Sequence, residues 1–465
     1  MLKDEYIYQE IQEQLRLIKI HQNAPRISIP KVKGRTIITG AGDSYCASEF
    51  GEWILKDKYN VIALPAMDAL QYSAIGYKLV ARNLFPFVVP TLVGLIEPAK
   101  AGTTNKYIPD KRVRATKLTK NDVVIGISVS GLTNRIIEIF KLAKKVGAYS
   151  IAITDNANSP ASQLADETWL TYASPQEELK HSSYKLKEAK EYIGYHHDVA
   201  QTKTFWAVLL TLLRASQIKF DWKCLNKNTK KLLSEKFYKP ILNKADIWAK
   251  AKQTFFLSTH PFSIISRFAT YKIYEYNLIA HFTEMEEYCH TQYFITRKND
   301  NVVFLCHNDL TLKRALEIIP TIQKLFSANI ILIKPQNLTT QIESDCLKTL
   351  FIPIKPRLLH DKTVRNDASG VSLRGTLVTK QSRFCDFLNN RIENDCSKKG
   401  LTIIEIPATK NPIIQFFEMV IAVEWLTYLI GRINAKNINT FHAGFNTEEL
   451  VKGSYYTIRK TSLIN

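Results

Sequence analysis

The sequence predicts an α/β protein built from parallel sheets with helices on both faces, and it predicts this arrangement twice. Short apolar segments, typical of fully buried strands, alternate with longer segments whose apolar residues recur at the helical period. Such alternation favours parallel sheets, because the chain returns to each new strand through a covering helix. The alternation resumes after a Lys-rich polar stretch at about residues 222–245, so we expect the second half to be a degraded copy of the first.

The most informative unit covers residues 122–154. An apolar strand at 123–127 is followed by the loop 128–133, which reads Ser-Val-Ser-Gly-Leu-Thr. A helix then runs to Val146, Gly147 supplies its stop, and a second strand begins at Tyr149. Hydroxyls and backbone N–H groups at a helix N-terminus suit a bound phosphate, but Ser and Thr also cap ordinary helices. The loop alone leaves both interpretations open.

The remaining elements of the first half follow from the same patterns. In chain order we expect a lead-in helix at 10–20, a strand ending in a Gly turn at 34–42, a helix at 43–55 that starts near Ser44, a Pro-rich insertion at 82–120, a short helix after Pro160, a strand at 167–172, a partly helical charged stretch at 176–198 and an apolar helix at 205–213. Ser44 therefore stands at a second junction between a strand and a helix N-terminus.

The second half repeats strands and helices up to a polar tail. We expect strands at 254–258, 302–306, 329–333 and 401–406, helices at 262–280, 312–326 and 416–430, and an irregular insertion at 340–400. The predicted division is a lead-in at 1–34, a first domain at 35–221, a second domain at 245–440 and a tail at 441–465. Ligands of such sheets bind beyond the carboxyl ends of the strands, where Ser44 and the loop 128–133 lie.

Composition excludes several classes of protein. The net charge of +20 is spread along the chain without a zinc finger, a helix-turn-helix signature or an aromatic–basic platform, so we expect no specific nucleic-acid partner. No apolar stretch approaches the roughly 20 residues of a membrane span, and the N-terminus is not a secretory signal. Seven Cys without a C-x-x-C pair suggest reduced thiols and a cytoplasmic location. We expect no metal and no cofactor, and we assign His196, His197 and Asp198 to a loop because no third ligand is spaced to join them.

Five ordered segments resemble the double sugar-isomerase (SIS) domain family, in particular the isomerase half of glucosamine-6-phosphate synthase. They are EIQEQ at 10–14, GAGDSYCAS at 40–48, SVSGLT at 128–133, TDNANSPASQLADETW at 154–169 and VAQTKTF at 199–205. The resemblance implies two tandem SIS domains, each a flavodoxin-like three-layer sandwich. It also implies phosphate ligands at Ser44, Ser128, Ser130 and Thr133, and sugar contacts at Val199 and Gln201. Val129 and Leu132 depart from the family pattern, and Gln201 replaces a Ser.

Two further segments resemble the family's catalytic motifs. Lys272-Ile273-Tyr274-Glu275 is similar to K-L-K-E, which implies Glu275 as the base that moves a proton in isomerisation. Glu287-Tyr288-Cys289-His290 is similar to E-L-K-H, which implies His290 as the group that opens the sugar ring. Glu287 either orients His290 or is itself the base. Lys452 is the candidate for the family's closing Lys, and Thr291-Gln292 stands where the family has Gly-Pro.

The resemblance implies an enzyme that acts on a hexose 6-phosphate through an enediol. It would be an aldose–ketose isomerase, or a deaminase that interconverts glucosamine 6-phosphate with fructose 6-phosphate and ammonia. A sugar-phosphate-binding regulatory protein without turnover is the alternative from another class. A third interpretation is the synthase half of a split enzyme with a separate glutaminase subunit, because the chain shows no glutaminase segment upstream of its SIS repeat. We expect a homodimer, in which His290 acts in its own subunit or in its neighbour's.

Overall fold

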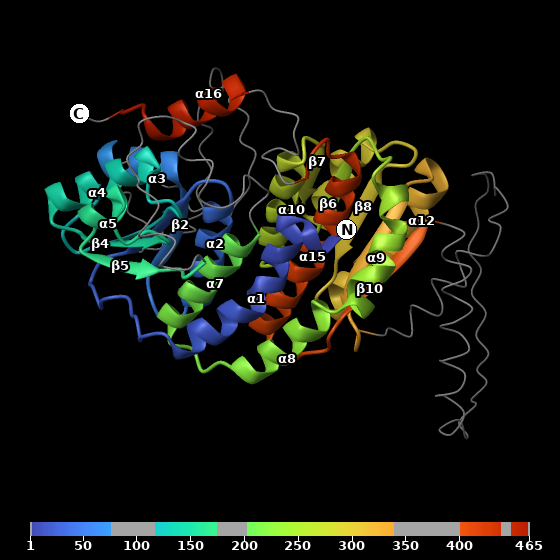
Figure 1. Ribbon diagram of the computed structural model, residues 1–465, viewed down its shortest axis with the longest axis horizontal. Coiled ribbons are helices and arrows are strands. Elements are labelled where there is room, and N and C mark those ends of the chain that lie inside the picture. The colour runs from blue at the N-terminus through green and yellow to red at the C-terminus, as the bar shows by residue number, and fades with distance from the viewer. Residues whose placement is uncertain (1, 76–116, 174–201, 339–399, 439–447, 464–465) are drawn as a thin grey trace, which may run out of the picture. The chain divides into compact units, whose positions relative to one another are not determined.

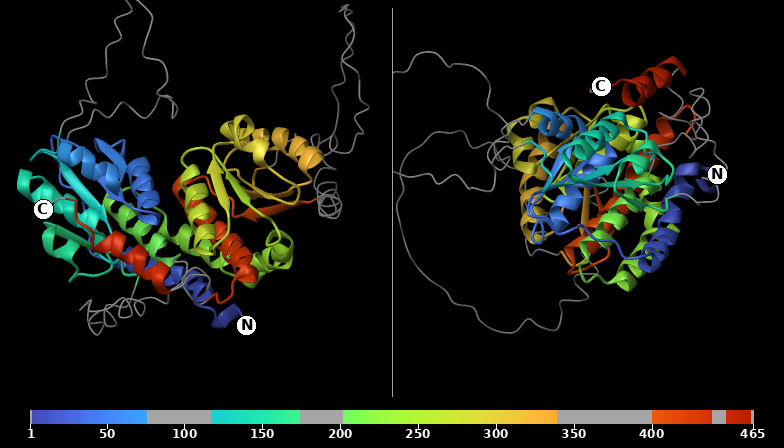
Figure 2. Two further views of the ribbon diagram at one scale, coloured as in Figure 1. Left: turned by 90° about the horizontal axis from the view of Figure 1, so that it is seen from above. Right: turned by 90° about the vertical axis from the view of Figure 1, so that its left-hand side faces the viewer.

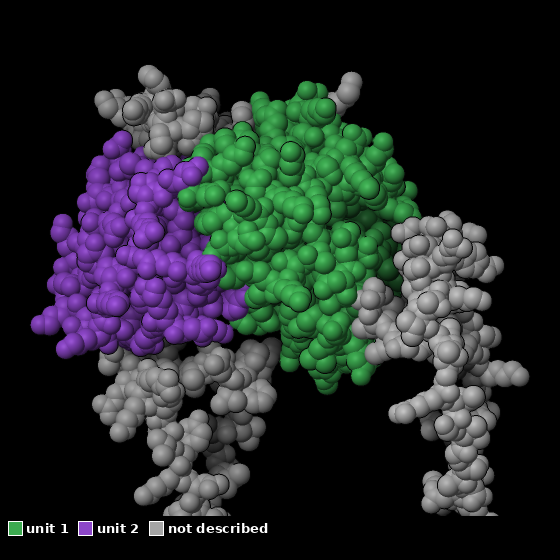
Figure 3. Space-filling view, turned by 90° about the horizontal axis from the view of Figure 1, so that it is seen from below, with its two compact units in different colours: residues 1–22, 190–203, 220–446 green, residues 23–189, 204–219, 447–465 purple. Residues whose placement is uncertain are grey.

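The computed structural model describes residues 2–75, 117–173, 202–338, 400–438 and 448–463 (Figure 1). The chain forms two compact units, neither of which is continuous in sequence (Figure 3). Unit 1 contains residues 1–22, 190–203 and 220–446, and unit 2 contains residues 23–189, 204–219 and 447–465. These units describe which segments of the chain pack together. The domain boundaries expected from the sequence, 35–221 and 245–440, stay a prediction.

Unit 2 is built on a five-stranded parallel sheet with the strand order β2-β1-β3-β4-β5. Its strands are β1 (Thr36–Gly40), β2 (Val61–Pro65), β3 (Val123–Ile127), β4 (Tyr149–Thr154) and β5 (Glu167–Leu170). Its helices are α2 (Asp43–Leu55), α3 (Ala66–Ile75), α4 (Asn134–Val146), α5 (Pro160–Leu164), all but the first residue of α7 (Lys203–Ser216), and α16 (Glu448–Arg459). Both β1 and β3 are fully buried, as the apolar runs predicted.

Unit 1 repeats this topology. Its strands are β6 (Thr254–Leu257), β7 (Ala280–Thr283), β8 (Asn301–Leu305), β9 (Asn329–Pro335) and β10 (Leu401–Ile406), and all neighbouring pairs are parallel. Their spatial order is β7-β6-β8-β9-β10. The second, first, third, fourth and fifth strands in sequence therefore follow one another across both sheets. The prediction of a duplicated α/β fold is confirmed.

One face of the second sheet is covered by α15 (Pro412–Asn434), a helix that is apolar all round. It contacts α8 (Trp222–Leu232), α9 (Glu235–Trp248) and α10 (Ser263–Glu275) (Figure 2). The expectation that no apolar stretch is long enough to span a membrane is wrong for α15, which meets that test by length and composition. However, 94% of its most apolar window is buried, which is the pattern of a helix in the core of a protein.

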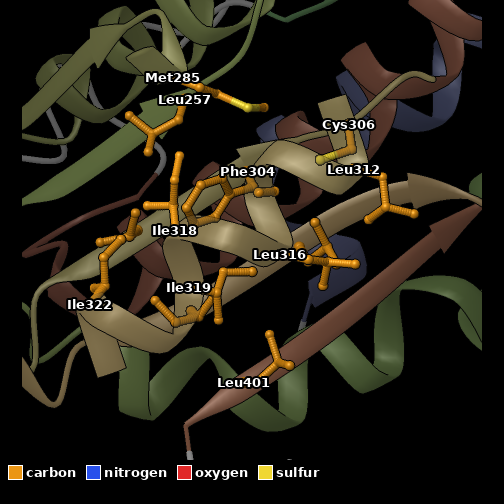
Figure 4. Close-up of a cluster of buried hydrophobic side chains, with 14 of the residues drawn as sticks. Leu257, Met285, Phe304, Cys306, Leu312, Leu316, Ile318, Ile319, Ile322 and Leu401 are labelled. Carbon is orange, nitrogen blue, oxygen red and sulfur yellow. The ribbon is translucent and has the colours of Figure 1, made fainter. Parts of the chain in front are cut away.

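The opposite face of the second sheet carries α11 (Met285–His290) and α12 (Asp309–Phe326). Buried side chains of both helices join strand residues in one hydrophobic cluster, in which Leu316 and Ile319 of α12 lie over Leu401 of β10 (Figure 4). Covering helices on both faces make unit 1 a three-layer structure. The short 3₁₀ segments η1 (Leu2–Asp4) and η3 (Gln292–Ile295) and the N-terminal helix α1 (Tyr6–Asn23) complete it.

The helix expected at 262–280 is wrong at its end, because α10 stops at Glu275. Asn277 takes a left-handed backbone with φ of 61°, its N–H donates to Tyr274 O, and the N–H of Leu278 donates to Ile273 O. These two bonds form a Schellman motif, which closes the helix and turns the chain into β7. The strand β7 escaped prediction because its four residues, Ala-His-Phe-Thr, are mostly only partly buried at the edge of the sheet.

Two other polar segments are more regular than expected. The Lys-rich stretch 222–245 forms α8 and α9, because its apolar residues share one buried face (Leu225, Leu232, Tyr238, Ile241 and Trp248). Residues 448–459 of the expected polar tail form α16. The insertions expected at 82–120 and 340–400 and the charged stretch at 176–198 lie wholly or almost wholly outside the described residues.

Candidate functional site

The loop between β3 and α4 is held in shape by Gly131. This residue has a φ of +68°, which favours glycine, and a Cβ at this position would collide with the side chain of Ser159. The neighbouring strand braces the loop, because Thr154 Oγ1 and the N–H of Asp155 both donate to Val129 O at 2.9 Å. The backbone of this loop is therefore fixed from both sides before any ligand arrives.

The hydroxyls of this loop are turned toward one another. Ser128 Oγ and Thr133 Oγ1 are hydrogen-bonded at 2.9 Å, and Ser130 Oγ accepts the N–H of Leu132 at 3.3 Å. Thr133 is the N-cap residue of α4, yet its side chain makes no capping hydrogen bond. Ordinary capping would direct this hydroxyl to the first turn of the helix. The geometry therefore departs from the plain helix cap and leaves hydroxyls that can rotate toward an anion.

A second helix N-terminus stands at the same edge of the sheet. Strand β1 pairs directly with β3, so the turn that follows β1 lies next to the loop that follows β3. That turn is tight, since Gly42 has a φ of 57° and a Cβ at Gly40 would lie 2.6 Å from Ser44 Cβ. Ser44 is half-buried in the first turn of α2, whose N-cap Gly42 offers no side chain. Two helix N-termini at adjacent strand ends favour a negatively charged ligand.

The corresponding loop of unit 1 is closed to an anion. After β8, Asn308 and Thr311 form a capping box: Asn308 Oδ1 accepts the N–H of Thr311, and Thr311 Oγ1 accepts the N–H of Asn308. Asp309 adds a negative charge to the first turn of α12. His307 is stacked on Phe262, and burial lowers its pKa to about 4, so it is neutral at pH 7. Of these two corresponding loops, only the one that follows β3 leaves its hydroxyls outside a helix cap.

Glu275 and its neighbour Lys272 form a buried ion pair at the end of α10. Lys272 Nζ is fully buried and donates to both carboxylate oxygens of Glu275, at 2.9 and 2.8 Å. The ammonium also lies 5.3 Å from the ring centre of Phe268. Glu275 itself keeps 25% of its side chain exposed, so it is anchored by Lys272 while remaining accessible. Lys272 is the first residue of the segment that resembles K-L-K-E, but the sequence alone predicted no role for it.

Glu287 and His290 lie on the short helix α11. Both side chains are exposed, and Glu284 caps the helix by accepting the N–H groups of Glu286 and Glu287. Glu275 precedes β7 whereas Glu287 follows it, so the two carboxylates lie at opposite ends of that strand. Unit 1 by itself therefore does not gather Glu275 with Glu287 and His290 at one edge of its sheet.

The EIQEQ segment has a structural function that sequence reasoning missed. Glu10 is buried in α1 and accepts the N–H groups of Thr202 and Lys203 at 3.0 and 3.4 Å, at the start of α7. Glu13 pairs with Lys203 Nζ at 2.6 Å, and Gln14 donates to Glu424 of α15. Two segments of the family resemblance, 10–14 and 199–205, therefore meet in space. Val199 and Gln201 lie outside the described residues.

The C-terminal segment binds the first turn of α4. Thr461 O accepts from Asn134 Nδ2 at 2.7 Å and from Arg135, and Ser462 Oγ donates to Glu138 at 2.9 Å. Lys452 lies in α16, which precedes this segment, but its side chain is outside the described part of the structure. Within the described residues, no group of three His, Cys, Asp or Glu side chains could hold a metal ion.

Comparison with known proteins finds a domain match around the loop that joins β3 to α4. A family model described as the SIS domain matches residues 110–188, which contain the loop 128–133. The chain is 42% identical over 77 residues to N-acetylmuramic acid 6-phosphate etherase 1 of Bacillus licheniformis, and 44% identical over 75 residues to the etherase of Geobacillus thermodenitrificans. These matches cover 17% and 16% of this chain and 25% of each relative. The chain thus spans about a quarter of the length of these curated relatives.

Solved structures resemble almost the whole chain. The C-terminal domain of glucosamine-fructose-6-phosphate aminotransferase from Francisella tularensis has a TM-score of 0.56 at 14% identity, over 93% of this chain and 96% of that one. Tagatose-6-phosphate ketose/aldose isomerase from Escherichia coli has a TM-score of 0.57 at 14% identity, over 96% of both chains. At this identity the likeness shows the fold. The chain therefore contains a match to the SIS domain at residues 110–188, within a duplicated parallel-sheet fold that resembles these structures over almost its whole length.

Proposed function

We propose that this protein is an enzyme that acts on a phosphorylated sugar and holds the phosphate at the edge formed by β1 and β3. The observation that carries the proposal is the Ser128–Thr133 pair, whose hydroxyls face one another instead of capping α4. Ser44 and Ser130 complete the set of neutral donors. Neutral hydroxyls and helix N-termini bind a phosphate without burying a counter-charge.

The reaction we propose is proton transfer on a ring-opened hexose 6-phosphate. Glu275 is the proposed base, and the ion pair with Lys272 fixes its orientation. His290 has the side-chain type suited to ring opening near neutral pH, and Glu287 orients it or replaces Glu275 as the base. Lys452 is the proposed stabiliser of the developing oxyanion. His290 is exposed on α11, which is compatible with action across a homodimer, the assembly that we propose.

Fructose 6-phosphate and glucosamine 6-phosphate are the proposed substrates, because structures of matching fold include an isomerase of tagatose 6-phosphate and the aminotransferase domain. Ether cleavage of a 6-phosphorylated sugar is a second candidate reaction. It is favoured by the identity of 42% over 77 residues with an N-acetylmuramic acid 6-phosphate etherase. Both candidates require the same phosphate loop and differ only in the chemistry at the sugar.

Proton NMR in D₂O separates these reactions. With fructose 6-phosphate, we expect an aldose 6-phosphate, or glucosamine 6-phosphate when ammonium is added, together with deuterium at C1 or C2. Loss of lactate from N-acetylmuramic acid 6-phosphate would instead select ether cleavage. If neither substrate reacts and no deuterium enters, catalysis on these sugars is excluded and the binding-protein interpretation replaces it.

The residue assignment needs a matched control. Thr133→Val removes a hydroxyl from the proposed site. Thr211→Val removes one from the buried face of α7, where Thr211 Oγ1 donates to the Ala207 carbonyl of its own helix at 2.9 Å. We expect Thr133→Val to raise the KM for the phosphosugar at least tenfold and Thr211→Val to leave it unchanged. Equal effects of the two changes would contradict the assignment.

A further inference from the structure

A cavity of about 520 Å³ opens in unit 1, at the carboxyl edge of the second sheet. Gln336 directly follows β9, and Pro407 and Ala408 directly follow β10, so the ends of two adjacent strands form one wall. The helix α8 forms the other wall. Ligands of parallel sheets bind beyond the carboxyl ends of strands, and a cavity of this volume is in the range of small-molecule sites.

Three lysines of α8 line this cavity: Lys223, Lys227 and Lys231. Their spacing of four residues places them in one row along the helix, at intervals of about 6 Å. All three are exposed, and no ion pair joins any of them to a described residue. Each ammonium can therefore turn toward a ligand without first breaking an internal contact.

The carboxylates near the three lysines already have hydrogen-bond or ion-pair partners. Asp221 lines the cavity, but its carboxylate accepts the N–H of Cys224 at 2.9 Å as the N-cap of α8. Glu405 of β10 pairs with Lys334 at 3.0 Å. Within the lining, three ammonium groups thus face one carboxylate. Such an excess of positive charge in a concave site favours an anion that carries more than one charge.

The polar part of the lining is held in place by a buried carboxyl group. Asn228 lines the cavity and is buried, and its Nδ2 donates to Glu418 Oε1 of α15 at 2.6 Å. Burial raises the pKa of Glu418 to about 8, so this group is predominantly neutral at pH 7 and does not oppose an anion. The exposed side chain of Gln336 adds an amide group that can bond phosphate oxygens or sugar hydroxyls.

We propose that this cavity is a second anion site, which binds a small molecule with two or more phosphate charges and is separate from the phosphate loop of unit 2. Lysines on successive turns, about 6 Å apart, can each bind one of two linked phosphate groups, so a ligand with two phosphates makes more charge contacts with the row than a single phosphate does. Within the described lining there is no aromatic ring on which a nucleobase could stack. The ligand class is therefore a polyphosphate or a sugar bisphosphate rather than a nucleotide.

Calorimetric titration of the full chain with inorganic pyrophosphate, in about 0.15 M salt, tests this site. We expect saturable binding of one pyrophosphate that the double variant Lys227→Gln/Lys231→Gln weakens at least tenfold. The control is Lys230→Gln/Lys236→Gln, which removes the same charge from exposed lysines that do not line the cavity. An equal loss in the control would show that only the overall charge of +20 attracts the anion, and would overturn the proposal.

Further probes separate this site from the proposed sugar site. The variant Ser128→Ala/Thr133→Val is expected to bind pyrophosphate as tightly as the wild type. If this variant no longer bound pyrophosphate, the anion would belong to the loop of unit 2. In Ser128→Ala/Thr133→Val, where the proposed phosphate site of unit 2 is disabled, orthophosphate is expected to bind at least tenfold more weakly than pyrophosphate. Equal affinity in that variant would contradict a row that engages two charges. Tighter binding of single-stranded RNA than of pyrophosphate, with the same lysine dependence, would overturn the small-molecule assignment.

Discussion

Ser128 Oγ and Thr133 Oγ1 lie 2.9 Å apart across the loop that joins β3 to α4. This contact takes the Thr133 hydroxyl away from the helix that it would otherwise cap. When a phosphate binds, both hydroxyls can rotate to donate to it, at the cost of one neutral hydrogen bond of about 1 kcal/mol. The pair therefore keeps both hydroxyls at the N-terminus of α4, where the proposed phosphate would bind.

Gly131→Ala is expected to disrupt this loop. The new Cβ would meet Ser159, and φ of +68° is unfavourable for Ala, so we expect a loss of about 2–3 kcal/mol of folding stability and weaker binding of sugar phosphates. Gly147→Ala is the matched control, since Gly147 is also left-handed, with a φ of +77°, but its Cβ would meet only Lys120 Cβ at an ordinary contact distance of 3.6 Å. Urea denaturation of both variants measures the difference, and equal losses would show that only the backbone angle matters.

Glu275→Gln is expected to destabilise unit 1 by about 2–3 kcal/mol as well as to stop proton transfer. The change leaves the buried ammonium of Lys272 without its carboxylate. The double variant Lys272→Met/Glu275→Gln removes both charges, and we expect it to regain most of the lost stability. Thermal unfolding of the three proteins decides this point. If the double variant were no more stable than Glu275→Gln, the unpaired ammonium of Lys272 would not be the cause of the lost stability.

Glu418 predicts a specific dependence of stability on pH. Its pKa is raised from 4.5 to about 8, so the folded state retains a proton that the unfolded chain loses. The contribution of Glu418 to the free energy of unfolding is therefore complete below pH 4.5 and declines up to about pH 8, by on the order of 5 kcal/mol at most. We expect Glu418→Gln to match the wild type at pH 5 and to be more stable at pH 9. A difference that does not vary with pH would exclude the shift.

Glu10→Ala is expected to cost about 2 kcal/mol, because two N–H groups at the start of α7 lose a buried acceptor. Glu13→Ala, which removes a half-exposed partner of Lys203, is expected to cost less than about 1 kcal/mol. Chemical denaturation of the two variants provides the comparison. If Glu13→Ala proved the more harmful, the capping role of Glu10 would be wrong.

Most helices and strands could be predicted from the sequence, because apolar periodicity and helix stop signals are local properties of the chain. Helix α2 and strands β3, β4 and β10 begin and end as expected, and Gly147 adopts the left-handed conformation of a helix stop. The strand β7 could not be found in this way, because only its hydrogen bonds to β6 define it. The apolar face of α8 was hidden by its lysines, because of which the stretch 222–245 was interpreted as a domain boundary.

The candidate site was predictable only in its local part. Ser128, Ser130 and Thr133 share one loop, and Ser44 follows a strand that pairs with β3, so topology brings them to one edge. The cap that Glu10 provides for Thr202 joins residues 192 positions apart, and no local pattern contains that information. The Lys272–Glu275 pair lay within a single helical turn, and the spacing of three residues was the signal that could have revealed it.

Binding calorimetry with fructose 6-phosphate is the most direct test of the phosphate loop. We predict saturable binding of fructose 6-phosphate and no measurable binding of fructose. We also predict that Ser128→Ala/Thr133→Val binds fructose 6-phosphate at least tenfold more weakly than the wild type or Thr211→Val does. Fructose 6-phosphate affinity that is unchanged in Ser128→Ala/Thr133→Val would contradict the claim that this loop holds the phosphate.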